Sequence, residues 1–149
     1  MSGIDHIARV YKYSVGADMK LNMDLVRTLL LYVEEKADRP ISNLENILIE
    51  DWSSDDVAYH VMLCEEAGFI VAQIDTMPDI EDPVILHVNY TVYRLTLNGH
   101  EFLDATRAPQ HWIAIKGNAQ KLGVNSLKAV GRIAEDYITH LIKQSFTGG

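Results

Sequence analysis

Apolar residues spaced three or four positions apart mark the first clear element of this chain. In the stretch NMDLVRTLLLYVEEKADRP they predict one buried face of a helix, because a helix completes a turn every 3.6 residues. Asn22 or Asp24 can cap the start of this helix, and Pro40 limits its end. We therefore expect a helix near residues 22–37.

A second helical pattern occupies SSDDVAYHVMLCEEAGFI. Ser53 or Ser54 can accept the free backbone N–H groups of its first turn. Asp55 and Asp56 suit the positive end of the helix dipole. Gly68 can leave the helix in a left-handed conformation and so ends it. Between the two helices, ISNLENILIEDWS is compatible with a short helix or a short strand.

The hydrophobic period then changes from 3.6 to 2, the period of a strand. FIVAQID and HVNYTVYRLT alternate, and TMPDIEDP between them holds two prolines and three acids. These stretches predict a two- or three-stranded antiparallel sheet with a long acidic tip. One face of the second strand is expected to carry Val88, Tyr90, Val92 and Arg94, and the opposite face Asn89, Thr91, Tyr93 and Leu95.

Three more helices are predicted toward the C-terminus. LTLNGHEFLDAT begins with Thr96 or Asn98 as a cap and ends before Pro109. QHWIAIKGNAQKLG and NSLKAVGRIAEDYITHLIKQ follow it. The last has an apolar stripe of Leu127, Val130, Ile133, Ala134, Tyr137, Ile138, Leu141 and Ile142. Two ways of covering this stripe remain open: a homodimer through residues 126–143, or packing against the helix at 22–37.

Length and composition place the chain among small globular proteins. It has 149 residues, of which 48% are hydrophobic, so it can bury a core. No apolar run approaches the roughly 20 residues that span a bilayer, and the N-terminus lacks a secretory signal pattern. The lone Cys64 rules out an internal disulfide. We expect a cytoplasmic protein, with the order of residues 1–18 left open.

Charge is distributed unevenly along the chain. Residues 40–93 contain eleven acids and no Lys or Arg, whereas residues 107–149 contain six basic groups and two acids. The middle of the chain is therefore an acidic block, and the C-terminal part is mildly basic. This division matters more than the total of −8.

The order of these elements resembles a winged helix, an α+β fold. EEAGFI and YRLTLNGHEFLD carry the specific part, since a glycine releases the chain into the first strand and a threonine caps the next helix. More closely, MKLNMDLVRTLLLYVEE, VAYHVMLCEEAGFI and RLTLNGHEFLDATRAPQHW resemble a family of short phage and prophage proteins of unknown function, over about residues 19–112 with a looser match to 143. The resemblance implies a winged-helix-like fold and a phage or prophage origin, and no activity.

The predicted organisation has three parts. Residues 1–18 depart from the family pattern and form an N-terminal extension. Residues 19–108 form the winged-helix-like domain, and residues 109–149 form the C-terminal helical extension.

In a winged helix, the helix at 54–67 would read DNA. Affinity for duplex DNA comes mostly from cations that neutralise phosphates, and this helix has none. DNA binding through 54–67 is therefore not expected. Instead we expect a protein-interaction module for a basic host protein surface, such as an inhibitor of a host defence or nucleic-acid-binding protein. An acidic surface that serves solubility alone is the plain alternative.

The expected partner-binding residues are Asp51, Trp52, Asp55, Asp56, Tyr59, Glu65, Glu66, Asp79, Glu81 and Asp82. The alternative function is a DNA-binding transcriptional regulator acting as a dimer. It would contact the DNA backbone through Lys116, Lys121, Lys128, Arg132 and Lys143.

Catalytic and metal chemistry receive little support from the sequence. His60 and Cys64 lie one helical turn apart, but two ligands are too few for a structural zinc site, even with His100 as a distant third. Cys64 lies among apolar neighbours, which favours an inert thiol. We expect no enzyme activity, no metal and no cofactor. For Trp52 and Trp112 we expect packing in or beside the core.

Overall fold

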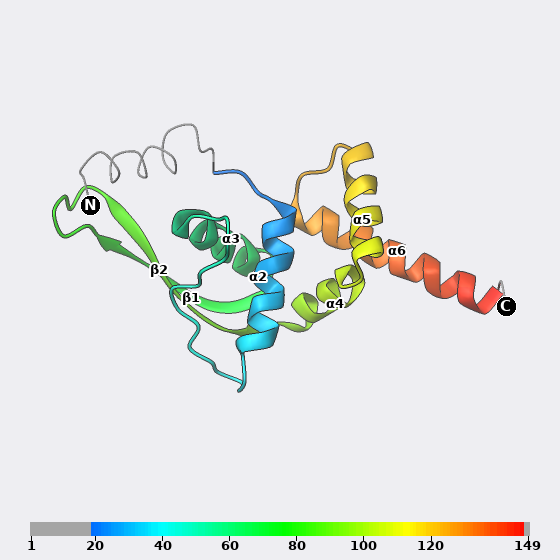
Figure 1. Cartoon of the computed structure of the whole chain (residues 1–149), viewed down its shortest axis with the longest axis horizontal. Coiled ribbons are helices and arrows are strands. Elements are labelled where there is room, and N and C mark those ends of the chain that lie inside the picture. The colour runs from blue at the N-terminus through cyan, green and yellow to red at the C-terminus, as the bar shows by residue number, and fades with distance from the viewer. Residues whose placement is uncertain (1–18, 148–149) are drawn as a thin grey trace.

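The computed structural model describes residues 19–147, and this part has five helices and one two-stranded antiparallel sheet (Figure 1). The elements are α2 (Met23–Lys36), α3 (Ser54–Glu66), β1 (Ile70–Pro78), β2 (Leu86–Leu95), α4 (Leu97–Thr106), α5 (Pro109–Lys121) and α6 (Leu127–Thr147). The predicted α+β class is confirmed, with a long C-terminal helix. No described helix has the length and apolar character needed to cross a membrane. The predicted extension at residues 1–18 lies outside the described residues.

Helix α2 lies within one residue of its predicted bounds at each end. The Asn22 side chain accepts a hydrogen bond from the backbone N–H of Leu25 at 3.0 Å and so caps the first turn. The apolar face is fully buried against the other elements; it consists of Leu25, Val26, Leu29, Leu30 and Val33. Local capping and helical period were enough to locate this element.

Helix α3 also begins and ends as its sequence predicts. The Ser53 hydroxyl accepts from the Asp56 N–H at 3.0 Å and donates to the Asp56 carboxylate at 2.8 Å. At the other end Gly68 has φ of 77°, and the N–H groups of Gly68 and Phe69 donate to the carbonyls of Glu65 and Cys64. This pair of bonds is a Schellman motif, which turns the chain sharply from the helix into β1.

The segment between α2 and α3 forms neither of the two elements predicted for it. It contributes one isolated bridge, in which Leu44 and Val92 exchange backbone hydrogen bonds of 3.0 and 2.9 Å. Asn46 and Asp51 have positive φ values of 47° and 72°, which interrupt any regular element. Ile47 is nonetheless buried, and its N–H donates to the Tyr90 hydroxyl at 2.8 Å. A third strand is therefore reduced to a single bridge.

The predicted strand faces are correct as far as Val92 and wrong after it. Tyr90 and Val92 are buried as expected. A β-bulge then changes the register, because Val71 pairs with Arg94 while Ala72 pairs with Val92. Tyr93 is the extra residue, so Arg94 turns outward and Leu95 turns into the core. Strict alternation could not reveal this change of face.

The two motifs that suggested the fold meet in space at the base of the hairpin. Thr96 caps α4 by accepting the Gly99 N–H at 3.0 Å, and its hydroxyl donates to the Gly68 carbonyl. The Thr96 N–H also donates to the Phe69 carbonyl at 3.0 Å. We call this contact of Gly68 and Phe69 with Thr96 and Gly99 the turn junction. It fixes the end of α3, the foot of the hairpin and the start of α4 relative to one another.

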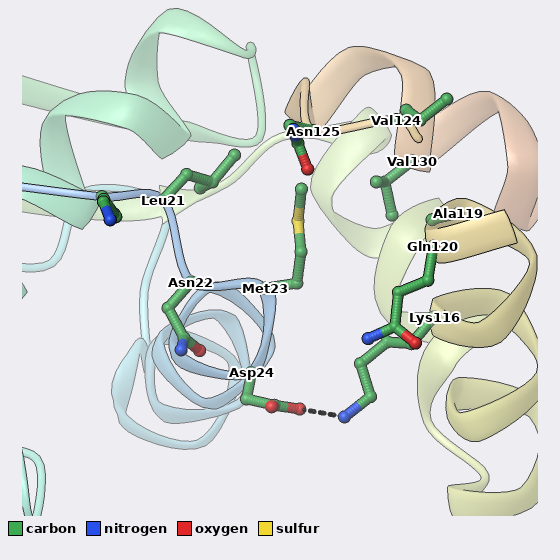
Figure 2. Close-up of a pocket in the computed structure, with 11 residues that line it drawn as sticks. Leu21, Asn22, Met23, Asp24, Lys116, Ala119, Gln120, Val124, Asn125 and Val130 are labelled. Atoms are coloured by element: carbon green, nitrogen blue, oxygen red, sulfur yellow. Dashed lines mark hydrogen bonds and ion pairs between the residues drawn. The ribbon is translucent and has the colours of Figure 1, made fainter. Parts of the chain in front are cut away.

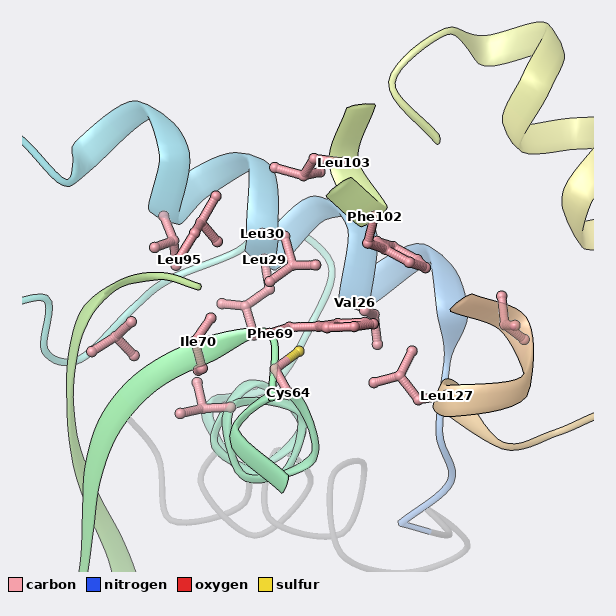
Figure 3. Packing of buried hydrophobic residues seen from close by; sticks show 14 of the residues in the cluster. Val26, Leu29, Leu30, Cys64, Phe69, Ile70, Leu95, Phe102, Leu103 and Leu127 are labelled. Carbon is pink, nitrogen blue, oxygen red and sulfur yellow. The ribbon is translucent and has the colours of Figure 1, made fainter. Parts of the chain in front are cut away.

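Aromatic rings fill the core on the helical side of the turn junction. Phe69 lies among Val26, Cys64 and Phe102, with 4.9 Å between the Phe69 and Phe102 ring centroids (Figure 3). Trp112 is buried as expected, and its indole N–H donates to the Asp24 carboxylate at 2.8 Å. Pro109 stands at the first helical position of α5, so it opens this helix as well as marking the end of α4.

Helix α6 packs chiefly against α4 and α5 rather than against α2, which corrects the intrachain alternative predicted for its stripe. Leu127, Val130 and Ala134 are buried. The distal part projects from the body (Figure 1), and Ile142 and Phe146 are 51% and 83% exposed. The apolar stripe is therefore covered over its first half and largely open at its end.

Gly99→Ala is expected to destabilise the protein by about 1–3 kcal/mol or more. A Cβ at position 99 would lie 2.1 Å from the backbone oxygen of Phe69, so the turn junction would have to open. Gly131→Ala is the matched control, because its Cβ would meet the Phe69 ring at an ordinary 3.7 Å and would gain up to about 1 kcal/mol of helix propensity. Chemical denaturation measures both. Equal effects of the two substitutions would contradict the role of the junction.

Candidate interaction surface

The outward side of α3 is acidic. Asp55, Glu65 and Glu66 are exposed, and no Lys or Arg occurs between residues 40 and 93. None of these three carboxylates has an ion pair or side-chain hydrogen bond within the described part of the chain, so they face solvent. We call Asp55, Glu65 and Glu66 the acidic face. Tyr59 lies half-buried on the same helix, its ring edge-on to that of His60.

Other acids predicted for partner binding are used by the fold. Asp56 belongs to the α3 cap described above. Asp79 accepts the N–H groups of Glu81 and Asp82 at 2.9 and 3.0 Å and contacts His87 Nε2 at 2.8 Å. The bond to His87 is the main cause that holds the pKa of Asp79 below its usual value. Asp82 in turn accepts the Val84 N–H at 3.2 Å. Of the three acids at the hairpin tip, Glu81 alone has no side-chain bond within residues 19–147.

Asp51 and Trp52 form the approach to α3. Asp51 is exposed in a left-handed conformation, and the Trp52 N–H donates to the Ile49 carbonyl at 3.2 Å. The Trp52 ring is half-buried and tilted against the His60 ring, with 6.3 Å between centroids. Packing beside the core, as predicted, is therefore its observed role, and one edge stays accessible.

His60 joins α3 to the start of α2. It is fully buried, and its Nε2 accepts the backbone N–H of Asn22 at 2.9 Å. Nδ1 must then carry the proton and donate to the Asp56 carbonyl at 2.7 Å, so both ring nitrogens are used by the neutral form. Burial lowers the pKa of His60. This histidine supports the helix that carries the acidic face.

The tip of the hairpin exposes aliphatic side chains, a feature that the sequence reading missed. The residues concerned are Met77, Ile80, Val84, Ile85 and Leu86, with Ile80 99% and Val84 88% exposed. We call these five residues the apolar tip. They stand beside Glu81 and extend away from the body (Figure 1). The stretch MPDIEDPVIL contains both acids and these aliphatic residues, and the prediction for this loop rested on the acids alone.

The basic residues predicted for the DNA-binding alternative fall into two groups. Lys116 is engaged, because its ammonium group lies 2.8 Å from the Asp24 carboxylate and 5.5 Å from the Trp112 ring centroid. The others are exposed and have no ion pair among residues 19–147. They are Lys121, Lys128, Arg132 and Lys143.

The ion pair of Lys116 lies in a cavity of about 500 Å³ between the start of α2 and the turn from α5 to α6 (Figure 2). Three of its polar side chains have structural roles. Asn22 caps α2, and Asp24 holds both Lys116 and Trp112. These contacts also hold the pKa of Asp24 below its usual value despite partial desolvation. Among the described residues, the lining of this cavity includes no Ser, Thr, Cys or His side chain.

Cys64 is buried, and its burial raises the pKa of the thiol to about 12, so it is protonated at neutral pH. Among the described residues, no three His, Cys, Asp or Glu side chains are grouped as metal ligands.

Comparison with known proteins places the chain in a family. Residues 20–125 match the family described as "Hypothetical protein (DUF2513)", which covers more than half of the chain. The chain belongs to the DUF2513 family. The predicted resemblance to a family of unknown function is thereby confirmed, while phage origin and the winged-helix type stay predictions.

A relative in the bacterium Haemophilus influenzae, described as "Uncharacterized protein", is 29% identical over 125 residues, which cover 83% of this chain and 99% of the relative. No solved structure matches the chain. The DUF2513 match ends at residue 125, so α6 lies beyond it.

His60→Gln is expected to flatten the dependence of stability on pH. Unfolded histidine protonates near pH 6.5, whereas folded His60 does so only at lower pH. The unfolded chain therefore binds more protons below pH 6.5, and the contribution of neutral His60 is full above that pH and lost as the pH falls. Urea denaturation from pH 7.5 to 5 measures the slope. His140→Gln, at an exposed position, is the control; equal slopes for wild type and His60→Gln would refute the assignment.

Proposed function

We propose that this protein is a non-catalytic protein-interaction module that binds a basic protein surface through the acidic face of α3 and the hairpin. The observation that carries the proposal is that every charged side chain on α3 is an acid. A cationic partner would be attracted over a distance of about 8 Å at physiological salt, the Debye length, and a polyanion would be repelled.

The order of α2, the Leu44 bridge, α3 and the β1–β2 hairpin supports a winged-helix-like reading of the fold. In that reading α3 takes the place of the recognition helix. Such a helix binds DNA through cations on phosphates, each of which releases counterions. Because Asp55, Glu65 and Glu66 are three of the four exposed residues of α3, we infer that groove reading has been replaced by protein binding.

The apolar tip adds a second kind of contact to this surface. Stable interfaces combine a desolvated apolar centre with a polar rim. Ile80 and Val84 supply aliphatic contact area, and Glu81 supplies a negative charge beside it. The resemblance to phage and prophage proteins implies a target in the bacterial host. A host protein with an exposed nucleic-acid-binding groove fits this acidic surface. Occupation of that groove would inhibit the host protein.

A DNA-binding regulator remains the second candidate. Exposed Lys121, Lys128, Arg132 and Lys143 favour it, since they are available for phosphate contacts. Against it, these residues belong to α5 and α6 and not to α3 or the hairpin. Retention on heparin or on duplex DNA at moderate salt supports this candidate, and flow-through supports the protein-binding module.

Charge reversal on α3 tests the proposal directly. The triple variant Asp55→Lys, Glu65→Lys and Glu66→Lys should lose a protein captured by the wild type from a bacterial host lysate. Once that protein is purified, calorimetry should show at least roughly tenfold weaker binding to the variant, because a like-charged contact replaces an attractive one.

The matched control reverses three charges elsewhere, with Lys128→Glu, Arg132→Glu and Lys143→Glu, and should retain the partner. Capture that survives the α3 triple variant, or a captured protein whose contact surface is acidic, would refute the proposal. A wild-type protein that binds duplex DNA at moderate salt through α3 would also refute it.

A further inference from the structure

Exposed apolar residues gather at two places on this molecule. Nine of the thirteen large apolar residues that are exposed among residues 19–147 belong either to the apolar tip or to the two C-terminal helices and their connection. In the second group they are Ile113, Leu122, Ile142 and Phe146. Exposed apolar residues concentrated on a few elements in this way are a feature of interaction sites.

A groove lies between α5 and α6 beside the second group. It has a volume of about 440 Å³, with Leu122, Ile133 and Tyr137 as apolar lining and Lys121 and His140 at its polar margin. Asp136 is the one acid that lines it. Lys143, also unpaired in the described chain, follows His140 by three residues on α6, which places it nearly one helical turn further along.

The apolar tip and this groove are complementary. The tip combines Ile80, 99% exposed, with the free carboxylate of Glu81. The groove combines aliphatic and aromatic lining with the unpaired ammonium group of Lys121. If Ile80 enters the groove, its side chain contacts the apolar lining and Glu81 can pair with Lys121. The apolar and the charged parts of both surfaces are then matched.

One chain cannot bring its own two surfaces together. The hairpin tip and the end of α6 project from opposite ends of the long axis of the molecule (Figure 1). Two copies placed antiparallel would put each tip beside the groove of the other copy. This arrangement has two-fold symmetry and closes after two molecules, with both contacts made twice.

We propose that this protein forms a reciprocal dimer in which the hairpin tip of each copy, centred on Ile80 and Glu81, docks into the α5–α6 groove of the other copy beside Lys121. Pairing of two α6 helices was the simpler expectation for residues 126–143. It would cover Ile142 but would leave both apolar tips in water. The reciprocal dimer covers the apolar tip and the groove with its exposed Leu122. It goes beyond the proposed function because it needs no third protein, and a partner that contacts the tip would compete with the second copy.

Charge exchange tests the docking. Glu81→Lys and Lys121→Glu should each weaken the dimer about tenfold at each contact, and hence about a hundredfold for two contacts. A 1:1 mixture of the two variants should regain wild-type affinity as a heterodimer. At one of its contacts the lysine introduced at the tip faces the glutamate introduced at the groove, and at the other the wild-type pair forms. Sedimentation equilibrium over a wide concentration range measures each dissociation constant.

Glu65→Lys on α3 and Lys128→Glu on α6 are matched controls, since they change net charge equally and lie outside the tip and the groove lining. Ile80→Asp should abolish the dimer while circular dichroism and thermal unfolding stay unchanged, because Ile80 has almost no contact within its own chain. A monomer at every concentration, a dimer insensitive to Glu81→Lys, or a mixture that fails to recover would each overturn the inference. Failure here leaves partner capture by the acidic face untouched, because that assay reports on α3.

Discussion

The close approach of two backbone turns holds the described part of this protein together. At the turn junction one threonine side chain serves two segments that lie nearly thirty residues apart, accepting from the Gly99 N–H and donating to the Gly68 carbonyl. The approach is possible because position 99 has no Cβ, which would otherwise collide with the Phe69 carbonyl. Helix α3, the hairpin and α4 all leave from this point, so their mutual orientation depends on it.

Features set by neighbouring residues could be predicted from the sequence. The caps at Asn22, Ser53 and Thr96 and the exit at Gly68 depend on side chains and backbone groups a few residues apart, and all four occur as expected. Helical period located the buried faces of α2 and α3 for the same reason. These local rules gave most of the element order and the α+β class.

Features set by distant residues could not be read in this way. The segment after α2 is fixed by the Leu44–Val92 bridge and by a hydrogen bond from the Ile47 N–H to the Tyr90 hydroxyl. The two residues of this bond are 43 positions apart. The bulge at Tyr93 depends on pairing with β1, and it exchanges the faces of the sheet on which the next two residues lie. In each case the local conformation is set by a residue of another element, so the pattern of neighbouring residues could not predict it.

The candidate surface shows the same division. Composition identified an acidic block, but it could not tell which acids are engaged in hydrogen bonds, as Asp56 and Asp79 are, and which have no such bond among the described residues, as Glu65 and Glu66. Likewise, the sequence does not distinguish Lys116 from a solvated lysine, because its partner Asp24 is 92 residues away along the chain. The number of charges in a region therefore exceeds the number available to a partner.

The hairpin is secured at only one of its ends. Ile70 and Leu95 at its base are buried, whereas β1 from Asp75 onward and β2 up to His87 are exposed. Residues added or removed in matched pairs along the outer strands would change how far the loop reaches while the helices keep their places. The length of this arm can therefore change without disturbing the packing that holds the domain together.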